Sequence, residues 1–408
     1  MKTIAIAARL LLGAMFIFSG FVKGIDPWGS TYKFIDYFKA FDLMWMVDFA
    51  FALAVLQNLA EVVIGVALII GLRMKETAWV SLLFMGFFTI LTFILALTNP
   101  VTDCGCFGDA LVLTNWETFY KNLAFMIPTV IVFLYRKKYV PPFGSAGEWV
   151  LVTVVSIVMF QISMYCYNHL PLIDFRPYKI GADIPQGMII PDDAPTDVYK
   201  TTLFYEKDGV VQEFSMNDYP WNDSTWTFVD IKNDLIKKGY VPPIKDFSIT
   251  AAGGFDLTDE VLEYDGYTFL LVAHNLTKSD ASGLKKASEI ADFCDKHSYN
   301  FYCLTATLMG DVEVIKSELG LEYQFCSTDD ITLKTMIRAN PGLILLQNGT
   351  VIGKWHHNDM PEVETLKPNL LSFAMEYQAA KNKDKLIKVL LLAFAVFALA
   401  IYHFRIND

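Results

Sequence analysis

The chain has 408 residues, a hydrophobic fraction of 54% and a formal net charge of −11 at pH 7. This apolar fraction exceeds that of ordinary soluble domains, and the length allows two or three domains. The acidic balance argues against nucleic acid and anionic lipid headgroups as partners.

Apolar blocks are predicted to form six membrane spans, because most approach the roughly 17 to 25 residues that a bilayer requires. The fourth block reaches this length when it is extended back through Trp116. The first block could instead be a signal peptide, but Arg9 interrupts it and no clear cleavage site follows. The blocks are Ile4 to Val22, Phe49 to Leu72, Ala78 to Leu97, Leu123 to Tyr135, Val150 to Tyr165 and Leu386 to Phe404.

Basic loops predict the orientation, because Lys and Arg near span ends are retained in the cytoplasm. Arg73 and Lys75 follow the second block, and three basic residues at 136–138 follow the fourth. We therefore expect a multi-pass protein of the plasma (inner) membrane, with residues 103–109 outside and residues 168–382 extracytoplasmic or periplasmic.

The predicted organisation combines a membrane all-α four-helix bundle and further spans with an extracytoplasmic α/β domain. An aromatic-rich loop at 24–48 is expected to lie on the membrane as an amphipathic helix. A hairpin turning at 207–209, with a further strand at 225–230, indicates a small β-rich module. The predicted parts are a four-span domain (1–138), a fifth span (148–167), a linker and β-rich module (168–244), the α/β domain (245–380) and a C-terminal span (386–404).

From residue 246 onward, strand and helix patterns alternate. We expect strands at 267–274, 301–305 and 323–326, and helices at 282–298, 312–319 and 332–337. A final strand pair, 343–347 and 351–355, surrounds the Asn348-Gly349 turn. This order predicts a mixed sheet covered by helices.

The run from Arg338 to Gly349, with Pro341 before an apolar strand, resembles the thioredoxin-like pattern. The resemblance covers about residues 245–367 and implies a cis bond at Pro341, facing an active-site dithiol. Members of that superfamily carry Cys-x-x-Cys where this chain has His-Asn-Leu-Thr-Lys-Ser-Asp at 274–280. We therefore expect a redox-inert domain that docks a partner.

The motif Asp103-Cys104-Gly105-Cys106-Phe107-Gly108-Asp109 provides the candidate catalytic residues, Cys104 and Cys106. A Cys-x-Cys disulfide closes a small ring, which a central glycine relaxes. A reactive thiol needs a lowered pKa, whereas the flanking aspartates raise it unless Lys121 or Lys23 lies close. A structural disulfide is the alternative. No metal site is predicted, because no His or second Cys pair accompanies the motif.

Several motifs resemble the DoxX and MauE families of redox-associated membrane proteins, whose four-helix architecture is similar to that of vitamin K epoxide reductase. They are Arg9 to Gly13, Phe18 to Lys23, Glu61 and Cys104 to Gly108. This resemblance covers about residues 1–138. With a tethered thioredoxin-like domain, the whole chain resembles a Bacteroidetes-type group of DoxX family proteins.

Arg9 and Glu61 are the candidate intramembrane polar pair, expected in the cytoplasmic half. The pair either fixes helix packing or makes Glu61 a proton carrier, with Gln57 and Asn58 completing a polar pocket. Cys166 is a candidate resolving thiol, with a buried apolar thiol as the alternative.

The leading hypothesis is a membrane thiol and disulfide redox protein. Its expected partners are the lipid bilayer and an extracytoplasmic protein client. It would exchange electrons with a substrate thiol or with a quinone cofactor. Whether it is an enzyme is left open. The alternative is a non-enzymatic membrane assembly or interaction factor with a structural Cys pair. Transport is a third hypothesis, disfavoured because repeat and broken-helix signals are missing.

Overall fold

The computed structural model describes residues 2–140, 142–245, 247–367, 369–381 and 383–384. The span predicted at 386–404 lies outside the described residues. The chain divides into two compact units, one formed by Met1–Ala182 with Ser248–Asp408 and the other by Asp183–Phe247.

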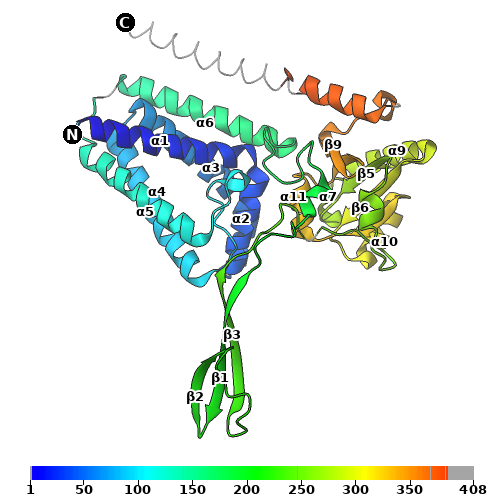
Figure 1. Ribbon diagram of the computed structural model, residues 1–408. Coiled ribbons are helices and arrows are strands. Elements are labelled where there is room, and N and C mark those ends of the chain that lie inside the picture. The colour runs from blue at the N-terminus through cyan, green and yellow to red at the C-terminus, as the bar shows by residue number, and fades with distance from the viewer. Residues whose placement is uncertain (1, 141, 246, 368, 382, 385–408) are drawn as a thin grey trace. The chain divides into compact units, whose positions relative to one another are not determined.

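In the described part of the chain, five helices are long and apolar enough to cross a membrane. They confirm the first five predicted spans and a multi-pass membrane protein. Figure 1 shows these helices gathered together in the N-terminal part of the first unit. Their bounds are α1 Lys2–Ile25, α3 Ala50–Ile70, α4 Met74–Thr98, α5 Asn115–Tyr135 and α6 Ser145–Asn168.

Glycines allow α1 and α3 to pack closely. A Cβ on Gly13 would lie 2.9 Å from the carbonyl oxygen of Gly65, and a Cβ on Gly20 would lie 2.8 Å from the Cβ of Glu61. Small residues at such crossings are typical of membrane helices, because they let backbones approach. These contacts also fix the register of the two helices, with Gly20 opposite Glu61.

The predicted helix in the aromatic-rich loop is α2 (Pro27–Ala40), followed by the 3-10 helix η1 (Met44–Phe49). Asp26 caps α2 by accepting a hydrogen bond from the Gly29 amide, and Pro27 occupies the first turn. A capping box of Thr114 and Glu117 begins α5. Between α4 and α5 runs the loop, residues 99–114, that carries the two cysteines.

The α/β domain of the first unit contains a six-stranded sheet with the order β4-β7-β6-β5-β8-β9. β5 pairs in parallel with β6 and antiparallel with β8, which confirms the predicted mixed sheet. Its strands are β4 Thr250–Ala251, β5 Tyr267–Val272, β6 Asn300–Thr305, β7 Gln324–Ser327, β8 Gly342–Gln347 and β9 Thr350–His356.

Helices cover both faces of this sheet (Figure 1). Phe269 and Leu271 of β5 share one core with Leu284 and Ile290 of α9. Leu270 is equally buried and, by the two-residue period of a strand, points to the opposite face. The helices are α8 Thr258–Leu262, α9 Ala281–His297, α10 Met309–Leu319 and α11 Asp330–Met336, and residues 370–381 are also helical.

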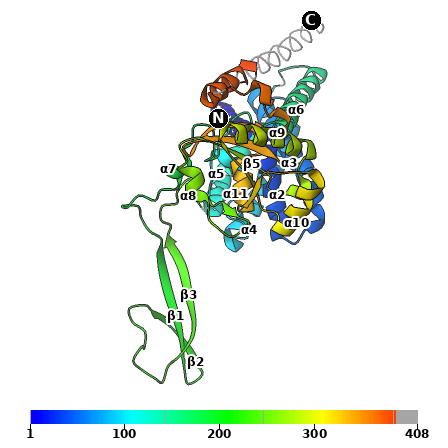
Figure 2. The same ribbon diagram turned by 90° about the vertical axis from the view of Figure 1, so that its right-hand side faces the viewer.

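The second unit is a long antiparallel sheet with the order β2-β1-β3, preceded by the short helix α7 (Ile184–Met188) (Figure 2). The strands are β1 Val198–Lys207, β2 Val210–Ser215 and β3 Thr227–Lys237, so the third strand extends well past the predicted 225–230. Asp208 and Gly209 adopt positive φ at the predicted hairpin turn.

The unit boundaries differ from the predicted ones at the linker. Residues 168–182 belong to the first unit, where the Gly181 amide donates to Val351 O at 2.8 Å and the Val351 amide donates to Ala182 O at 2.9 Å. Residues 181–182 therefore pair with β9 at the edge of the sheet. The Pro and Gly content of the linker gave no strand pattern from which this pairing could be predicted.

Candidate functional site

The sulfur atoms of Cys104 and Cys106 lie 3.0 Å apart in the loop between α4 and α5. Gly105 between them has φ +66°, a region that disfavours any residue with a Cβ. A Cβ there would also lie 2.9 Å from Cγ of Lys33. Glycine is therefore needed both for the turn and for the close approach of α2.

Helices α1 and α2 hold the backbone of the pair. The Tyr37 hydroxyl on α2 donates to the Cys104 carbonyl at 2.6 Å, and the Ser19 hydroxyl on α1 donates to the Cys106 carbonyl at 2.7 Å. Both carbonyls would otherwise need a solvent partner in a half-buried loop. The two cysteines thus sit in a fixed backbone rather than in a free loop.

Both aspartates of the motif are neutralised by cations from other segments. Lys33 Nζ lies 2.7 Å from Asp103 Oδ2, and Arg338 Nη2 lies 2.7 Å from Asp109 Oδ2. Arg338 Nε also lies 3.0 Å from Asp26 Oδ2. The sequence analysis predicted that the two aspartates would destabilise a thiolate by charge repulsion. Because both carboxylates are paired with cations, this repulsion is reduced.

The two thiols have opposite electrostatic environments. The hydrogen bond from Cys104, helped by the charges of Lys121 and Lys23, outweighs burial and lowers the pKa of Cys106 to about 6. The same hydrogen bond and burial raise the pKa of Cys104 well above its usual value. Cys106 is partly exposed whereas Cys104 is buried, so Cys106 is the accessible thiolate.

The predicted pairing of Arg9 with Glu61 is wrong. Glu61 instead forms a buried ion pair with Lys23 of α1. Arg9 lies against Gly71 and over the Tyr139 ring, 5.2 Å from its centroid. Eleven residues of α1 separate Arg9 from Gly20, about 16 Å along a helix, because each residue rises about 1.5 Å. The α1–α3 register therefore places Glu61 toward the cysteine end.

Glu61 lies in a polar pocket whose hydrogen-bond capacity is only partly used. Gln57 Nε2 donates to Glu61 Oε1 at 3.0 Å. Glu61 Oε2 and both amide atoms of Asn58 have no partner among the described residues, although Asn58 is fully buried. Buried polar atoms without partners cost free energy, so they indicate bound water or a functional role.

The α/β domain contacts α2 through residues that sequence reasoning missed. The Tyr32 ring lies 5.4 Å from the Arg338 guanidinium carbon and 6.3 Å, edge to face, from the His274 ring. Burial, with a contribution from Lys334, lowers the pKa of His274 to about 4, so this ring is neutral at pH 7. The domain that we expected to dock a partner therefore contacts α2 of its own chain through these residues.

The segment 274–280, where the resemblance predicts Cys-x-x-Cys, contains no cysteine. Residues Leu276–Lys278 form a 3-10 turn capped by Asn275. The Ser279 hydroxyl contacts the Asn340 side chain at 2.9 Å, and the Asn340–Pro341 bond is cis. Polar side chains of the domain itself thus fill the region beside Pro341.

The remaining cysteines lie in buried positions. Burial raises the pKa of Cys294 and Cys303, and raises that of Cys326 to about 11. Cys166 is fully buried on α6, three residues after Ser163, whose hydroxyl donates to Gly24 O at 3.0 Å. Its role as a resolving thiol stays a prediction.

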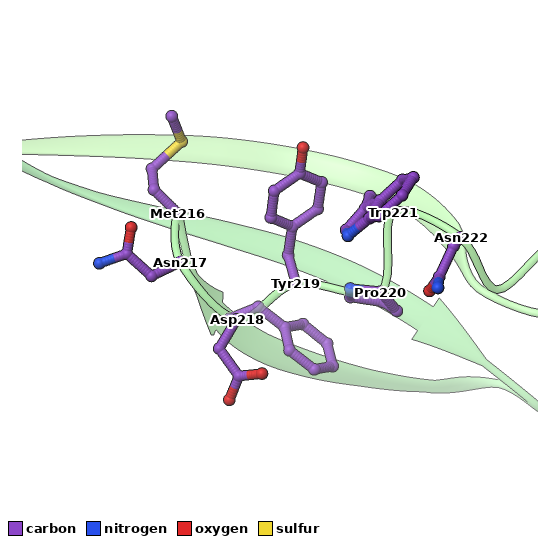
Figure 3. Close-up of a pocket in the computed structure, with 8 residues that line it drawn as sticks. Met216, Asn217, Asp218, Tyr219, Pro220, Trp221 and Asn222 are labelled. Carbon is purple, nitrogen blue, oxygen red and sulfur yellow. The ribbon is translucent and has the colours of Figure 1, made fainter.

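A cavity of about 540 Å³ lies in the second unit, at the turn that follows β2 (Figure 3). Met216, Tyr219 and Trp221 line it together with Asn217, Asp218 and Asn222. It contains no thiol or histidine. Within the described ranges, no cluster of three His, Cys, Asp or Glu side chains could hold a metal ion.

Two family patterns match parts of the chain. The family described as methylamine utilisation protein MauE matches residues 1–135, the region of α1 to α5 and the cysteine loop. A domain of unknown function, DUF8463, matches residues 199–238, the region of the three-stranded sheet. Residues 1–135 are therefore similar to the MauE family, and residues 199–238 to a domain without an assigned function.

No curated protein matches the chain. Among solved structures, one described as "a putative protein disulfide isomerase from Bacteroides thetaiotaomicron" is 13% identical, covering 33% of this chain and 84% of that one, with a TM-score of 0.24. An uncharacterised conserved protein from Geobacillus kaustophilus is 12% identical, covering 30% and 68%, with a TM-score of 0.22. Similarity at this level carries no argument about function.

Proposed function

We propose that this membrane protein catalyses thiol–disulfide exchange on a protein client through Cys104 and Cys106. The observation that carries the proposal is the contact of the two sulfur atoms at 3.0 Å, with lysines near the partly exposed Cys106. The match of residues 1–135 to a redox-associated membrane family supports it. The basic loops support an extracytoplasmic position of the pair.

The chemistry favours oxidation of the client. A thiolate stabilised in the reduced pair makes the corresponding disulfide more oxidising. A client thiolate attacks the Cys106 sulfur, the S–S bond breaks, and Cys104 leaves and takes up a proton. The second client thiolate attacks the mixed disulfide, and Cys106 leaves as a thiolate. The client loses two electrons and the pair gains two.

Regeneration of the disulfide needs a two-electron acceptor. We propose a membrane quinone, which takes two electrons and two protons and becomes a quinol. The α/β domain, which we interpret as thioredoxin-like and redox-inert, would hold the cysteine loop in place through Arg338 and leave the chemistry to the membrane half.

The test is the redox state of the full chain in nanodiscs, equilibrated with glutathione buffers, quenched in acid and alkylated. We expect Cys104 and Cys106 to lose alkylation together as the buffer becomes more oxidising. In an oxidising buffer, Cys104→Ser should keep a peptide with a single thiol as a mixed disulfide with Cys106, because no second cysteine releases it. Cys303→Ser, in the core of the α/β domain, should behave as wild type. Absence of a Cys104–Cys106 disulfide in every buffer would refute the proposal.

The second candidate function is a non-enzymatic assembly factor with a structural disulfide. The ion pairs Lys33–Asp103 and Arg338–Asp109 support it, because they fix both ends of the loop to other segments, as a structural disulfide between those ends would require. In the same titration, a structural disulfide would resist reduction by the most reducing glutathione buffer, whereas an exchange-active pair would open.

A further inference from the structure

The three-stranded sheet of the second unit has an aromatic face. Residues that pair directly across antiparallel strands point to the same side of a sheet. Leu203 of β1 pairs with Phe214 of β2 and with Ile231 of β3. Tyr205, two residues later on β1, points to the same side, and its ring centroid lies 5.9 Å from that of Phe214 and 5.6 Å from that of Phe228. We call these five residues the aromatic face.

No second layer covers the aromatic face in the part of the chain that the structure describes. Leu203 is the only buried residue of the three strands, whereas Phe228 and Ile231 are 51% and 47% exposed. Glu213 and Asp230, which flank the same position of β1, belong to the opposite face. An antiparallel sheet with one apolar and one polar face normally buries the apolar one, so this sheet lacks a covering layer.

The cavity that follows β2 adjoins the aromatic face. Phe214 belongs to both, and the Tyr219 ring stacks on the Tyr205 ring with 6.1 Å between their centroids. Met216 and the 76% exposed Trp221 also line the cavity (Figure 3). An exposed apolar surface beside a cavity of about 540 Å³ is typical of a site that binds another molecule.

The surroundings of the aromatic face are strongly acidic. Residues 205–230 contain one lysine and six carboxylates, which are Glu206, Asp208, Glu213, Asp218, Asp223 and Asp230. The lysine, Lys207, already lies 3.8 Å from the Asp223 carboxylate and 5.7 Å from the centroid of the Trp226 ring. Asp218 lines the cavity and has no cation partner among the described residues. The complementary partner therefore carries Lys or Arg beside apolar side chains.

This charge disfavours two other surfaces that could cover an apolar face. A second copy of the sheet would bring two acidic surfaces together, and an anionic bilayer surface would be repelled. A folded soluble protein rarely exposes a large apolar patch, whereas a chain that has not finished folding exposes many apolar side chains. The observations therefore favour an incompletely folded, basic segment as the partner.

We infer that the aromatic face and the adjoining cavity bind extended segments of incompletely folded client proteins, in which Lys or Arg lies next to aromatic or aliphatic residues. The inference rests on the proposed function for the nature of the partner, because a client of disulfide exchange binds before its own disulfides have formed. The sheet and Cys106 belong to one chain, so a bound client meets Cys106 at a raised effective concentration.

The first experiment measures the binding of cysteine-free peptides to the full chain in nanodiscs of zwitterionic lipid, by fluorescence anisotropy. The probe is a labelled short peptide of Phe, Lys and Ser. One control peptide has Gln in place of every Lys, and another has Ser in place of every Phe. Wild type should bind both controls at least about 10-fold more weakly than the probe, because each lacks one of the two complementary groups.

The second experiment repeats this measurement with variants of exposed residues, whose replacement leaves the fold intact. Trp221→Ala should weaken binding of the probe about 30-fold, as expected for a central aromatic contact. Asp218→Asn should weaken it about 5-fold and leave the affinity for the Gln peptide unchanged, because only the charge is removed. Val211 is 50% exposed and pairs with Glu206 on the opposite face, so Val211→Ala should bind the probe as wild type does.

Equal affinity of Trp221→Ala and wild type for the probe would overturn the inference, as would equal affinity of wild type for the Lys and Gln peptides. The other occupants have their own signatures, each without peptide binding, and each would also overturn it. A second copy would give a dimer in detergent that Trp221→Ala dissociates. A lipid surface would slow hydrogen exchange of residues 214–228 in nanodiscs relative to detergent.

Failure of the proposed function looks different from failure of this inference. The double variant Cys104→Ser with Cys106→Ser should bind the peptides with the affinity of wild type, because binding requires no thiol. If the cysteine pair does not cycle, the peptide affinities therefore still report on the aromatic face. A Cys104–Cys106 disulfide that cycles in a chain without peptide affinity would overturn the inference alone.

Discussion

The cysteines of the membrane half and of the α/β domain occupy opposite environments. Cys106 has lysines nearby and a thiol that donates to its sulfur, which lower its pKa to about 6. Cys303 and Cys326 lie in the sheet, where burial raises their pKa. The same residue type is thus a candidate nucleophile in a polar loop and an inert core residue in an apolar sheet.

The largest expected effect is on thiol reactivity. At pH 7 a thiol with a pKa of about 6 is roughly 90% thiolate and one with a pKa of about 11 is about 0.01% thiolate, a ratio of about 10⁴. Because the nucleophilicity of a thiolate falls with its pKa, we expect Cys106 of the reduced chain to react at least about 10² times faster than Cys326. Peptide-resolved mass spectrometry after iodoacetamide treatment measures both rates. The Cys106 rate should fall as the pH drops below about 6, and equal rates would remove the distinction between the two regions.

The next largest effect is expected on stability, at a carboxylate that binds two buried cations. Asp174 binds Arg176 Nε at 2.8 Å and Lys354 Nζ at 2.7 Å, and both basic side chains are buried. Asp174→Asn leaves two buried cations without an anion, so we expect a loss of about 3 to 5 kcal/mol in unfolding free energy. Denaturant unfolding measures it, with the exposed pair member Asp234→Asn as the control.

Acid should reproduce this loss. Burial opposes ionisation, but the charges of Arg176 and Lys354 outweigh it and hold the pKa of Asp174 below its usual range. A lowered folded-state pKa stabilises the fold above the unfolded value of about 3.9, and this stability is lost as the pH falls further. The unfolding free energies of wild type and Asp174→Asn should therefore converge below about pH 4.

A smaller effect is expected where the two regions meet. Arg338→Met removes the partner of Asp26 and Asp109, but these carboxylates keep some solvent contact, so we expect a loss of about 2 kcal/mol. Hydrogen exchange of the loop peptide 99–114 should accelerate. Arg338→Lys keeps the charge without the guanidinium fork and should give an intermediate rate. Unchanged exchange in Arg338→Met would show that the two regions are independent.

The smallest effect concerns the residue between the cysteines. Gly105→Ala places a Cβ at φ +66°, next to the flexible Lys33 side chain, and should cost about 1 to 2 kcal/mol. Gly86→Ala on α4 is the control, because a Cβ there meets nothing within 4 Å and alanine favours a helix. Equal unfolding free energies for the two variants would contradict a special role for Gly105.

The sequence predicted what depends on neighbouring residues along the chain. The strand and helix patterns from residue 267 to residue 356 match the observed elements within a few residues, because burial alternates with a local period. The five described spans followed from length and apolar content. Capping residues such as Thr114 and Glu117 also lie close together in sequence.

The contacts that complete the site were not predictable in this way. Arg338 belongs to the run that carried the thioredoxin-like resemblance, but its partners Asp109 and Asp26 lie 229 and 312 residues earlier. The choice of Lys23 rather than Arg9 for Glu61 depends on the register between α1 and α3. Neither composition nor spacing predicts that register. In the folded chain it follows from the close contact of Gly20 with Glu61.

The ion pairs on both sides of the cysteines also bear on kinetics. Lys33 binds Asp103 and Arg338 binds Asp109, so both ends of the seven-residue motif are held in place before reaction. The motif therefore loses little further conformational entropy when the cysteines react. Groups held in this way react as though at a very high effective molarity. A mixed disulfide between Cys106 and a small thiol such as glutathione should therefore be short-lived, because Cys104 displaces it before a second small thiol arrives.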